Sequence, residues 1–258
     1  MSEQHGSIAN RRDFLKLSAG LMSLGLLPPQ LMAGREQAIK AMAFDAFPIF
    51  DPRSVFARVN KLFPDQGKQF SLLWRTRIFE YTWLRTAAGQ YKDFWGCIED
   101  ALQFVARDLQ INLSQAQQQQ LMSAFLELKP YADVLPMLKS LKDKGVELGF
   151  LSNMTETMLL TNIERNGLQG MFQQVISTDE VKTFKPDVRA YQLAIDRFGL
   201  KKQEIMFVAF ASWDASGAKW FGYPTAWVNR LGFKPEELGA VPDISGKDLS
   251  VFEGLITT

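Results

Sequence analysis

Residues 146–153 read Val-Glu-Leu-Gly-Phe-Leu-Ser-Asn, a short apolar run that ends in two polar residues. Such a run, which directly follows Gly145 and precedes a helical pattern over about 155–165, is typical of a buried strand. Runs of this kind alternate with helical segments from residue 133 onward. Strands that are separated by helices predict a parallel sheet with helices on its faces.

The same signals place the other elements. A further apolar run, Ile39 to Phe44, reads as a buried strand although some eighty residues separate it from the others. The expected strands are 39–44, 146–151, 172–176, 205–210 and 225–228, and the expected helices are 133–144, 155–165, 187–198 and one that begins near Trp213.

Residues 53–129 have helical periodicity and almost no strand signal. We predict that Gln115–Gln120 is a solvated helix face. We therefore expect an α/β, Rossmann-like parallel-sheet core built from residues 36–52 and 130–258, with residues 53–129 inserted as a helical cap. The apolar sets of the cap are Leu72, Leu73, Ile78, Phe79 and Trp83, and Ile98, Leu102 and Val105.

Composition excludes several kinds of chemistry. Lysine and arginine (29) nearly balance aspartate and glutamate (28), so the chain has no basic field for nucleic acid. One cysteine, Cys97, excludes an internal disulfide and a cysteine-rich zinc site. The only histidine is His5, which excludes Ser-His-Asp and Cys-His catalysis, histidine-ligated metals and an imidazole base in the body of the chain. An enzyme of this composition depends on carboxylates, lysine, arginine, hydroxyls or a bound cofactor.

Residues 1–33 have the pattern of an export signal. Residues 11–16, Arg-Arg-Asp-Phe-Leu-Lys, precede a mildly apolar stretch over 17–27, and the segment resembles a bacterial twin-arginine signal. We expect the twin-arginine machinery to export the protein to the periplasm. An amphipathic N-terminal helix is the alternative. Leu31-Met32-Ala33 fits a cleavage site poorly, so retention of the segment as an anchor also stays open.

Polar side chains follow the predicted strands. Asp45 ends the first strand, Ser152-Asn153 ends the second, and Asp214 follows the strand at 205–210, while Lys185 precedes a helix. Because ligands bind outside the carboxyl ends of parallel strands, these groups are expected at one site. A carboxylate beside a lysine stays ionised and can act as a nucleophile, and a second carboxylate could hold the lysine or activate water. Taken singly, an aspartate or serine between a strand and a helix is usually an N-cap, and Lys185 alone is most typical of a surface lysine.

Several segments resemble the type II 2-haloacid dehalogenases, a branch of the haloacid-dehalogenase-like superfamily of hydrolases, over roughly 39–255. The Ser-Asn and Lys-Pro pieces occur across the superfamily, whereas the motifs at 80–85 and 213–218 are particular to the dehalogenases. The segments are Phe44-Asp45-Ala46-Phe47, Trp74-Arg75, Glu80-Tyr81-Thr82-Trp83-Leu84-Arg85, Glu99-Asp100-Ala101-Leu102, Leu151-Ser152-Asn153, Lys185-Pro186-Asp187 with Tyr191, and Trp213-Asp214-Ala215-Ser216-Gly217-Ala218-Lys219.

The resemblance implies hydrolysis of short 2-haloalkanoic acids to 2-hydroxy acids through a covalent aspartyl ester, without metal or cofactor. Asp45 would displace the halide from C2, and Arg75 on the cap would receive the halide or the substrate carboxylate. Lys185 would keep Asp45 ionised, and Asp214 would position or activate water. The residues expected to bind or enclose the substrate are Ser152, Asn153, Tyr191, Phe47, Phe94 and Trp213. Arg75 could instead be a surface residue near Arg77 and Arg85, and Phe94 and Trp213 could be core residues.

The chain departs from the family at two segments. Where the family usually has Tyr-Gly-Thr-Leu-Phe-Asp, this chain has Phe47-Pro48-Ile49-Phe50-Asp51, which is one residue shorter and lacks the glycine and the threonine. Where the family usually has Ser-Ser-Asn-Ala, this chain has Ala209-Phe210-Ala211-Ser212, and Ser212 is the candidate to replace one lost hydroxyl. These losses thin the set of hydrogen bonds around the expected site.

Two other functions stay open at this point. An exported protein that keeps the fold and binds small carboxylates with weak, retargeted or no catalysis would explain the missing polar residues. A phosphatase of the same superfamily would carry a second acid two residues after the nucleophile, but that position is Phe47, which neither donates a proton nor sits beside a hydrated Mg²⁺. The aromatic helix at 74–84 is a candidate surface for a homodimer.

Overall fold

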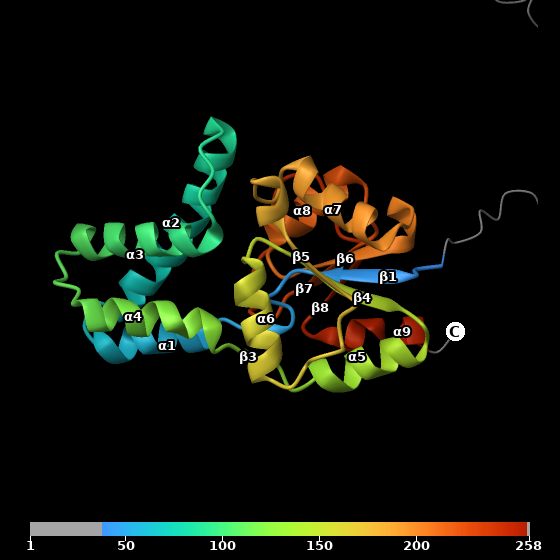
Figure 1. Ribbon diagram of the computed structural model, residues 1–258, viewed down its shortest axis with the longest axis horizontal. Coiled ribbons are helices and arrows are strands. Elements are labelled where there is room, and N and C mark those ends of the chain that lie inside the picture. The colour runs from blue at the N-terminus through green and yellow to red at the C-terminus, as the bar shows by residue number, and fades with distance from the viewer. Residues whose placement is uncertain (1–37, 257–258) are drawn as a thin grey trace, which may run out of the picture. The chain divides into compact units, whose positions relative to one another are not determined.

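The structure is a computed structural model that describes residues 38–256, so the signal predicted at residues 1–33 lies outside the described residues. Six strands form one parallel sheet in the order β5-β4-β1-β6-β7-β8 (Figure 1). The strands are β1 (Ala41–Phe44), β4 (Glu147–Ser152), β5 (Gln174–Ser177), β6 (Ile205–Ala209), β7 (Thr225–Val228) and β8 (Ile244–Gly246). The α/β parallel-sheet fold predicted from the sequence is confirmed.

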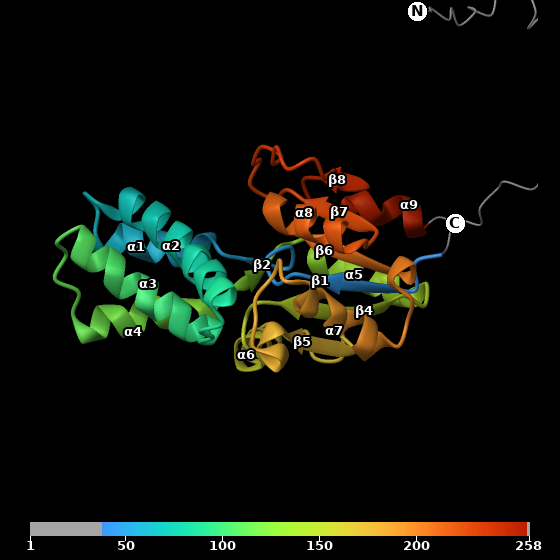
Figure 2. The same cartoon turned by 90° about the horizontal axis from the view of Figure 1, so that it is seen from above.

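Alternate side chains of β1 point to opposite faces of the sheet, as the pleat of a strand requires. Met42 and Phe44 pack with apolar residues of α5 (Val134–Asp143) and α6 (Glu156–Arg165). Ala41 and Ala43 pack with those of α7 (Val188–Phe198) and α8 (Ser212–Phe221). Helices therefore cover both faces of the sheet (Figure 1), and Figure 2 shows the molecule from the side of α7 and α8. The helices of this part are α5 (Val134–Asp143), α6 (Glu156–Arg165), α7 (Val188–Phe198), α8 (Ser212–Phe221) and α9 (Glu253–Ile256), with short 3-10 turns at η3 (Thr178–Val181), η4 (Lys202–Glu204) and η5 (Leu249–Phe252).

Two short antiparallel strands, β2 (Phe50–Asp51) and β3 (Lys129–Pro130), enclose a purely helical stretch. We call residues 53–129 the cap and the other described residues the core. The cap contains α1 (Arg53–Leu62), α2 (Gly67–Ala88), α3 (Phe94–Asp108), α4 (Gln115–Ser123) and the 3-10 turn η2 (Ala124–Leu126). No described helix combines the length and the apolar character that crossing a bilayer requires.

The buried face of α2 differs from the predicted one. Phe70, Trp74 and Ile78 are buried, and the indole N–H of Trp74 donates to the Ile98 carbonyl of α3 at 3.0 Å. Leu72 is 56% exposed and Trp83 is 38% exposed, so the apolar set expected from spacing does not form one buried stripe. The reason is that α2 packs on α3 through one face and borders a cavity with another, as described below.

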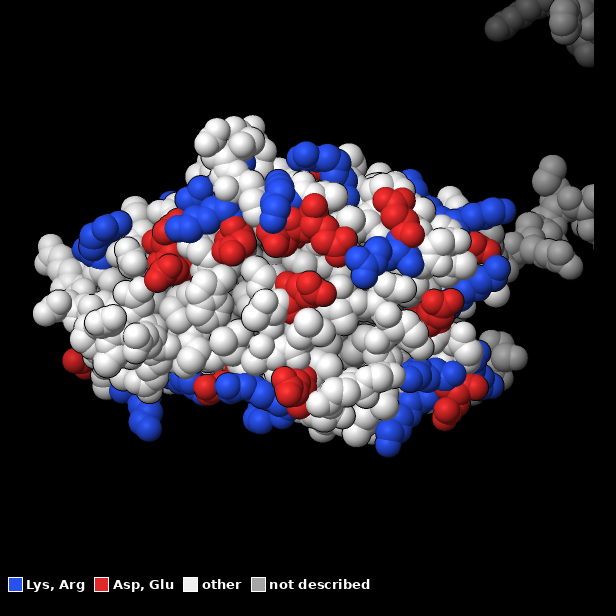
Figure 3. Space-filling view, in the orientation of Figure 1, with Lys and Arg blue, Asp and Glu red and all other residues white. Residues whose placement is uncertain are grey.

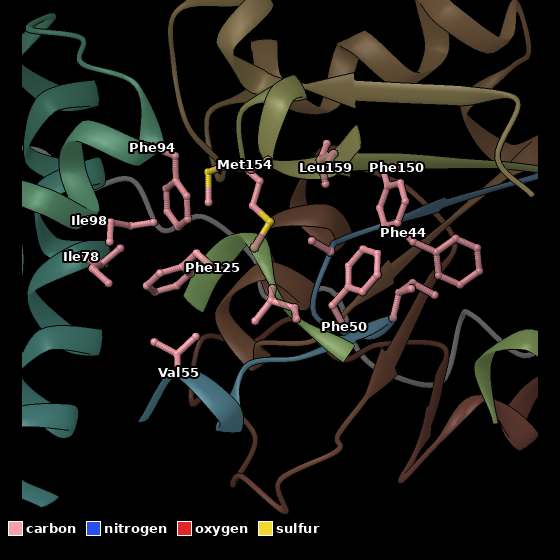
Figure 4. Packing of buried hydrophobic residues seen from close by; sticks show 14 of the residues in the cluster. Phe44, Phe50, Val55, Ile78, Phe94, Ile98, Phe125, Phe150, Met154 and Leu159 are labelled. Atoms are coloured by element: carbon pink, nitrogen blue, oxygen red, sulfur yellow. The ribbon is translucent and has the colours of Figure 1, made fainter. Parts of the chain in front are cut away.

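Two other predictions within residues 53–129 are confirmed, the apolar set at 98–105 and the helix at 115–120. Ile98, Leu102 and Val105 are buried along α3. The glutamine-rich segment is a helix with an exposed face, and Ser114 and Gln117 form a capping box at its start. One contiguous set of buried apolar residues extends from Phe94 of the cap to Phe150 of the sheet (Figure 4).

A buried arginine ties the loop after β1 to the core. Arg230 donates from Nη1 to both oxygens of Asp133, at 2.7 and 2.9 Å, and from Nη2 to the Pro48 carbonyl at 2.7 Å. Its side chain is 4% exposed. Asp133 in turn accepts the backbone N–H of Leu249 at 2.8 Å. Loss of Asp133 would leave the buried Arg230 charge poorly solvated, so the ion pair holds Arg230 in place. Arg230 in turn fixes the position of the loop that follows Asp45 through the Pro48 carbonyl.

Candidate active site

Three neighbouring strands carry the polar residues of the candidate site. Asp45 follows β1, and its backbone N–H donates to the Val208 carbonyl of β6 at 2.9 Å. Ser152 is the last residue of β4, and Asp214 lies in the first turn of α8 after β6. The carboxyl ends of parallel strands thus bring these side chains to one edge, as the sequence predicted.

Lys185 lies between the two carboxylates. Its Nζ donates to Asp45 Oδ1 at 2.9 Å and to Asp214 Oδ2 at 2.6 Å. Lys185 is 1% exposed, Asp214 2% and Asp45 8%. Nζ also lies 4.9 Å from the centre of the Phe207 ring. We call Asp45, Lys185 and Asp214 the charged triad, a set of two carboxylates and one ammonium almost without access to solvent.

The pKa values of Lys185 and Asp214 are shifted in the charged triad. Burial opposes the charged form of Lys185, but the carboxylates of Asp214 and Asp45 outweigh it, so the pKa of Lys185 is raised and the ammonium is retained. Burial raises the pKa of Asp214 to about 6, and the neighbouring Asp45 adds to this, while Lys185 and Tyr191 act in the opposite direction. Asp214 therefore exchanges a proton close to neutral pH.

The two oxygens of Asp45 have different surroundings. Oδ1 accepts from Lys185 and, at 3.4 Å, from the Ser152 hydroxyl. Oδ2 accepts only the backbone N–H of Phe47, at 3.2 Å, among the hydrogen bonds of the described residues. The shortened loop thus still supplies one donor to Asp45. Oδ2 is the less engaged oxygen and the better placed of the two to react.

Asn153 and Tyr191 hold the charged triad from behind. Asn153 Oδ1 accepts the backbone N–H of Lys185 at 3.0 Å and the hydroxyl of Thr178 at 3.3 Å. The Tyr191 hydroxyl donates to Asp214 Oδ1 at 2.7 Å. Tyr191 is fully buried and does not line the cavity, contrary to the prediction that it binds substrate, because its ring packs between the sheet and α8.

A cavity of about 520 Å³ lies between the charged triad and the cap. The core lines it with Ser152 and Asn153 besides the triad, and the cap lines it with residues of α1, α2 and α3. Its walls are mainly apolar and aromatic. The predicted site residues that reach this cavity are Asp45, Phe47, Arg75, Phe94, Ser152, Asn153, Lys185, Trp213 and Asp214.

Arg75 enters the cavity from α2. Its guanidinium carbon lies 5.2 Å from the centre of the Phe233 ring, and no carboxylate within residues 38–256 forms an ion pair with it. Because Arg75 lines the same cavity as Asp45, it is a cap residue of the site and not merely a surface cation. Phe94 is 2% exposed, and its ring lies 6.4 Å from that of Phe79.

Sequence reasoning missed one wall of the cavity. The loop between β7 and β8 contributes Leu231, Phe233, Lys234 and Glu236. The sequence of this loop contains no recognisable motif. The loop reaches the site only because β7, which precedes it, lies beside β6 in the sheet. Ser212 donates its hydroxyl to Glu236 at 2.6 Å, so this serine, expected to replace a lost hydroxyl, is tied to the loop.

Comparison with known proteins identifies the family. The model of the haloacid dehalogenase-like hydrolases matches residues 90–228. The (S)-2-haloacid dehalogenase of Pseudomonas sp. (strain YL) is 40% identical over 206 residues, which are 80% of this chain and 89% of that protein.

Solved structures agree with the sequence comparisons. An L-2-haloacid dehalogenase matches with a TM-score of 0.83 at 37% identity, covering 86% of this chain and 100% of the other. The L-2-haloacid dehalogenase of Xanthobacter autotrophicus with chloropropionic acid covalently bound matches with a TM-score of 0.78 at 28% identity, covering 85% and 98%. With its parallel sheet, its charged triad and these matches over most of its length, the chain belongs to the haloacid dehalogenase-like hydrolases.

Proposed function

We propose that the protein is a hydrolase that cleaves the carbon–halide bond of 2-haloalkanoic acids and releases 2-hydroxy acids. The observation that carries this proposal is the charged triad. It places the buried Asp45 carboxylate, paired with the Lys185 ammonium, at a cavity that Arg75 of the cap also lines. Relatives that are 2-haloacid dehalogenases by name support the substrate class.

The first step forms an ester at Asp45. A carboxylate oxygen attacks C2 from the side opposite the halogen, the carbon–halogen bond breaks, and the halide leaves with the bonding electron pair. The nucleophile loses no proton in this step, so the reaction needs no histidine. The Lys185 ammonium keeps Asp45 ionised, and the sparse partners of Oδ2 leave that oxygen free to attack.

Polar groups at the two ends of the cavity hold the substrate. Ser152 and the amide nitrogen of Asn153 bind the substrate carboxylate at the core end, since the carbonyl oxygen of that amide is already engaged by Lys185 and Thr178. Arg75 on the cap receives the departing halide, because it lines the cavity without a carboxylate partner among the described residues. Phe47, Phe94 and Trp213 enclose the reacting carbon.

The second step hydrolyses the ester. Asp214, with its pKa raised by burial to about 6, is mostly ionised at neutral pH and can accept a proton from the attacking water. Water adds to the ester carbonyl, and the bond between that carbonyl carbon and the ester oxygen attached to C2 breaks. The departing alkoxide takes the proton that Asp214 accepted, and the other proton of the water passes to solvent. Asp45 is thereby regenerated with one oxygen from water, and the 2-hydroxy acid leaves.

We also propose that the twin-arginine route exports the protein to the periplasm. Arg11 and Arg12 before Phe14-Leu15-Lys16, followed by the apolar stretch 17–27, support this proposal. A homodimer that pairs through α2 stays a prediction, which the exposed Leu84 of that helix supports.

Halide release tests the proposed function. With 2-chloropropanoate the protein should release chloride at the same rate with and without excess EDTA. Asp45→Asn should lower this rate by at least about a thousandfold, because it removes the attacking carboxylate. Asp196→Asn on the exposed face of α7 should leave the rate unchanged. Chloride release by the Asp45→Asn variant at the wild-type rate would contradict the proposal, and phosphate-ester hydrolysis that needs Mg²⁺ would favour a phosphatase.

The pH dependence of ester breakdown tests the role of Asp214. The rate that follows the initial burst of halide should fall as the pH drops below about 6, because the base must be ionised. Tyr191→Phe removes a donor to that carboxylate, which disfavours its charged form and should move the acid limb up by about half a unit to one unit. Tyr223→Phe removes only a hydrogen bond to the Tyr191 carbonyl and is the control. Identical acid limbs in wild type and Tyr191→Phe would exclude Asp214 as the base.

Export is tested by cell fractionation. The wild type and Arg35→Lys, a charge-preserving change outside the signal pattern, should accumulate in the periplasm. The double change Arg11→Lys and Arg12→Lys should leave the protein in the cytoplasm. The proposal fails if the double variant reaches the periplasm in the same amount as the wild type.

A further inference from the structure

The cavity is larger than a short 2-haloalkanoic acid requires. Its volume of about 520 Å³ falls among sites of about 300–1,000 Å³ that bury drug-sized ligands. A three-carbon haloacid displaces roughly five waters, or about 150 Å³ at about 30 Å³ each. More than half of the cavity therefore stays unfilled by such a substrate.

Aromatic rings line the unfilled part of the cavity, and the first of them, Phe47, lies beside the Asp45 carboxylate. Phe47, whose N–H binds Asp45, lies 5.7 Å from the Phe210 ring, and Phe210 lies 6.3 Å from the Phe233 ring. These centroid distances are those of interacting aromatic pairs. We call Phe47, Phe210 and Phe233 the aromatic row. It leads from the charged triad to the loop between β7 and β8.

Phe79 and Phe94 of the cap, together with Trp213 of the core, form a second aromatic wall. The Phe79 ring lies 6.4 Å from Phe94 and 5.4 Å from Trp213. These residues and the aromatic row line the same cavity, and the adjoining Ala211 offers no side-chain hydrogen bond. Polar side chains lie at the triad end, with Ser152 and Asn153. The other polar lining residues are Arg53, Ser71, Arg75, Thr76, Ser212, Lys234 and Glu236.

We infer that the preferred substrates are 2-halo acids whose C2 carries an aryl or arylmethyl group, which packs between the aromatic row and the wall of Phe79 and Trp213. This inference rests on the proposed function and names its substrate class. The carboxylate and the reacting carbon stay at the triad end, and the ring fills the volume that a methyl group leaves empty. A flat ring suits these walls because aromatic pairs gain from edge-to-face and offset contacts as well as from burial.

The test compares 2-chloro-3-phenylpropanoate with 2-chloropropanoate by chloride release. Wild-type kcat/KM should favour the phenyl substrate by about tenfold or more. Phe233→Ala should lower this ratio by about two- to tenfold, because it removes one face of the ring's environment. Leu238→Ala, an exposed position of the same loop that does not line the cavity, should leave the ratio unchanged.

The outcomes separate this inference from the proposed function. Turnover of 2-chloropropanoate with a ratio of one or less would overturn the inference and leave the proposed function intact. If neither acid is turned over, the proposed function fails. Calorimetric measurement of carboxylate binding to the Asp45→Asn protein then tests the aryl site separately. Tighter binding of 3-phenylpropanoate than of propanoate, by about tenfold or more, would support the aryl site, and equal binding would overturn it.

Discussion

The site depends on one buried ammonium between two carboxylates. Lys185 Nζ lies 2.9 Å from Asp45 and 2.6 Å from Asp214, and almost no solvent reaches the three groups. Without the ammonium, two carboxylates would be buried side by side, and at least one would take up a proton. The same contact opposes the rise to about 6 that burial causes in the pKa of Asp214, and it joins β1, α8 and the segment before α7. Three charged groups are thus buried together in the triad. On the molecular face shown in Figure 3, by contrast, Lys and Arg are interspersed with Asp and Glu.

The parallel sheet makes that contact possible, and the cap completes it. Asp45 and Ser152 end adjacent strands, and Asp214 follows the strand on the other side of β1. The carboxyl ends of these strands lie at the same edge of the sheet, and the cap lines the cavity at that edge. The paired strands β2 and β3 connect the cap to the core. Arg230 holds the Pro48 carbonyl, so the loop after Asp45 keeps its position although it lacks the glycine and threonine usual in the family. Within Ala209–Ala211, Phe210 places an aromatic ring in the wall of the cavity, between Phe47 and Phe233.

The sequence predicted the parts of this arrangement that have a strong local signal. The apolar runs and the helices between them locate the strands of the sheet within a few residues, except β8, whose three half-exposed residues lack an apolar run. Topology then brings Asp45, Ser152 and Asp214 together. Spacing could not predict which face of α2 is buried, because α2 contacts both α3 and a cavity. Nor could it place Phe233 and Arg230, whose roles arise from contacts with residues distant in the chain.

The central claim is that a carboxylate oxygen of Asp45, and not water, attacks C2 of the substrate. A single turnover in ¹⁸O water with the protein in excess over a 2-halo acid tests this claim directly, with mass spectrometry of the Asp45 peptide and of the product. The account predicts ¹⁸O in the peptide that contains Asp45 and an unlabelled hydroxyl group in the 2-hydroxy acid. Label in that hydroxyl group, with none in the peptide, would mean that water attacks C2 and that Asp45 acts only as a base.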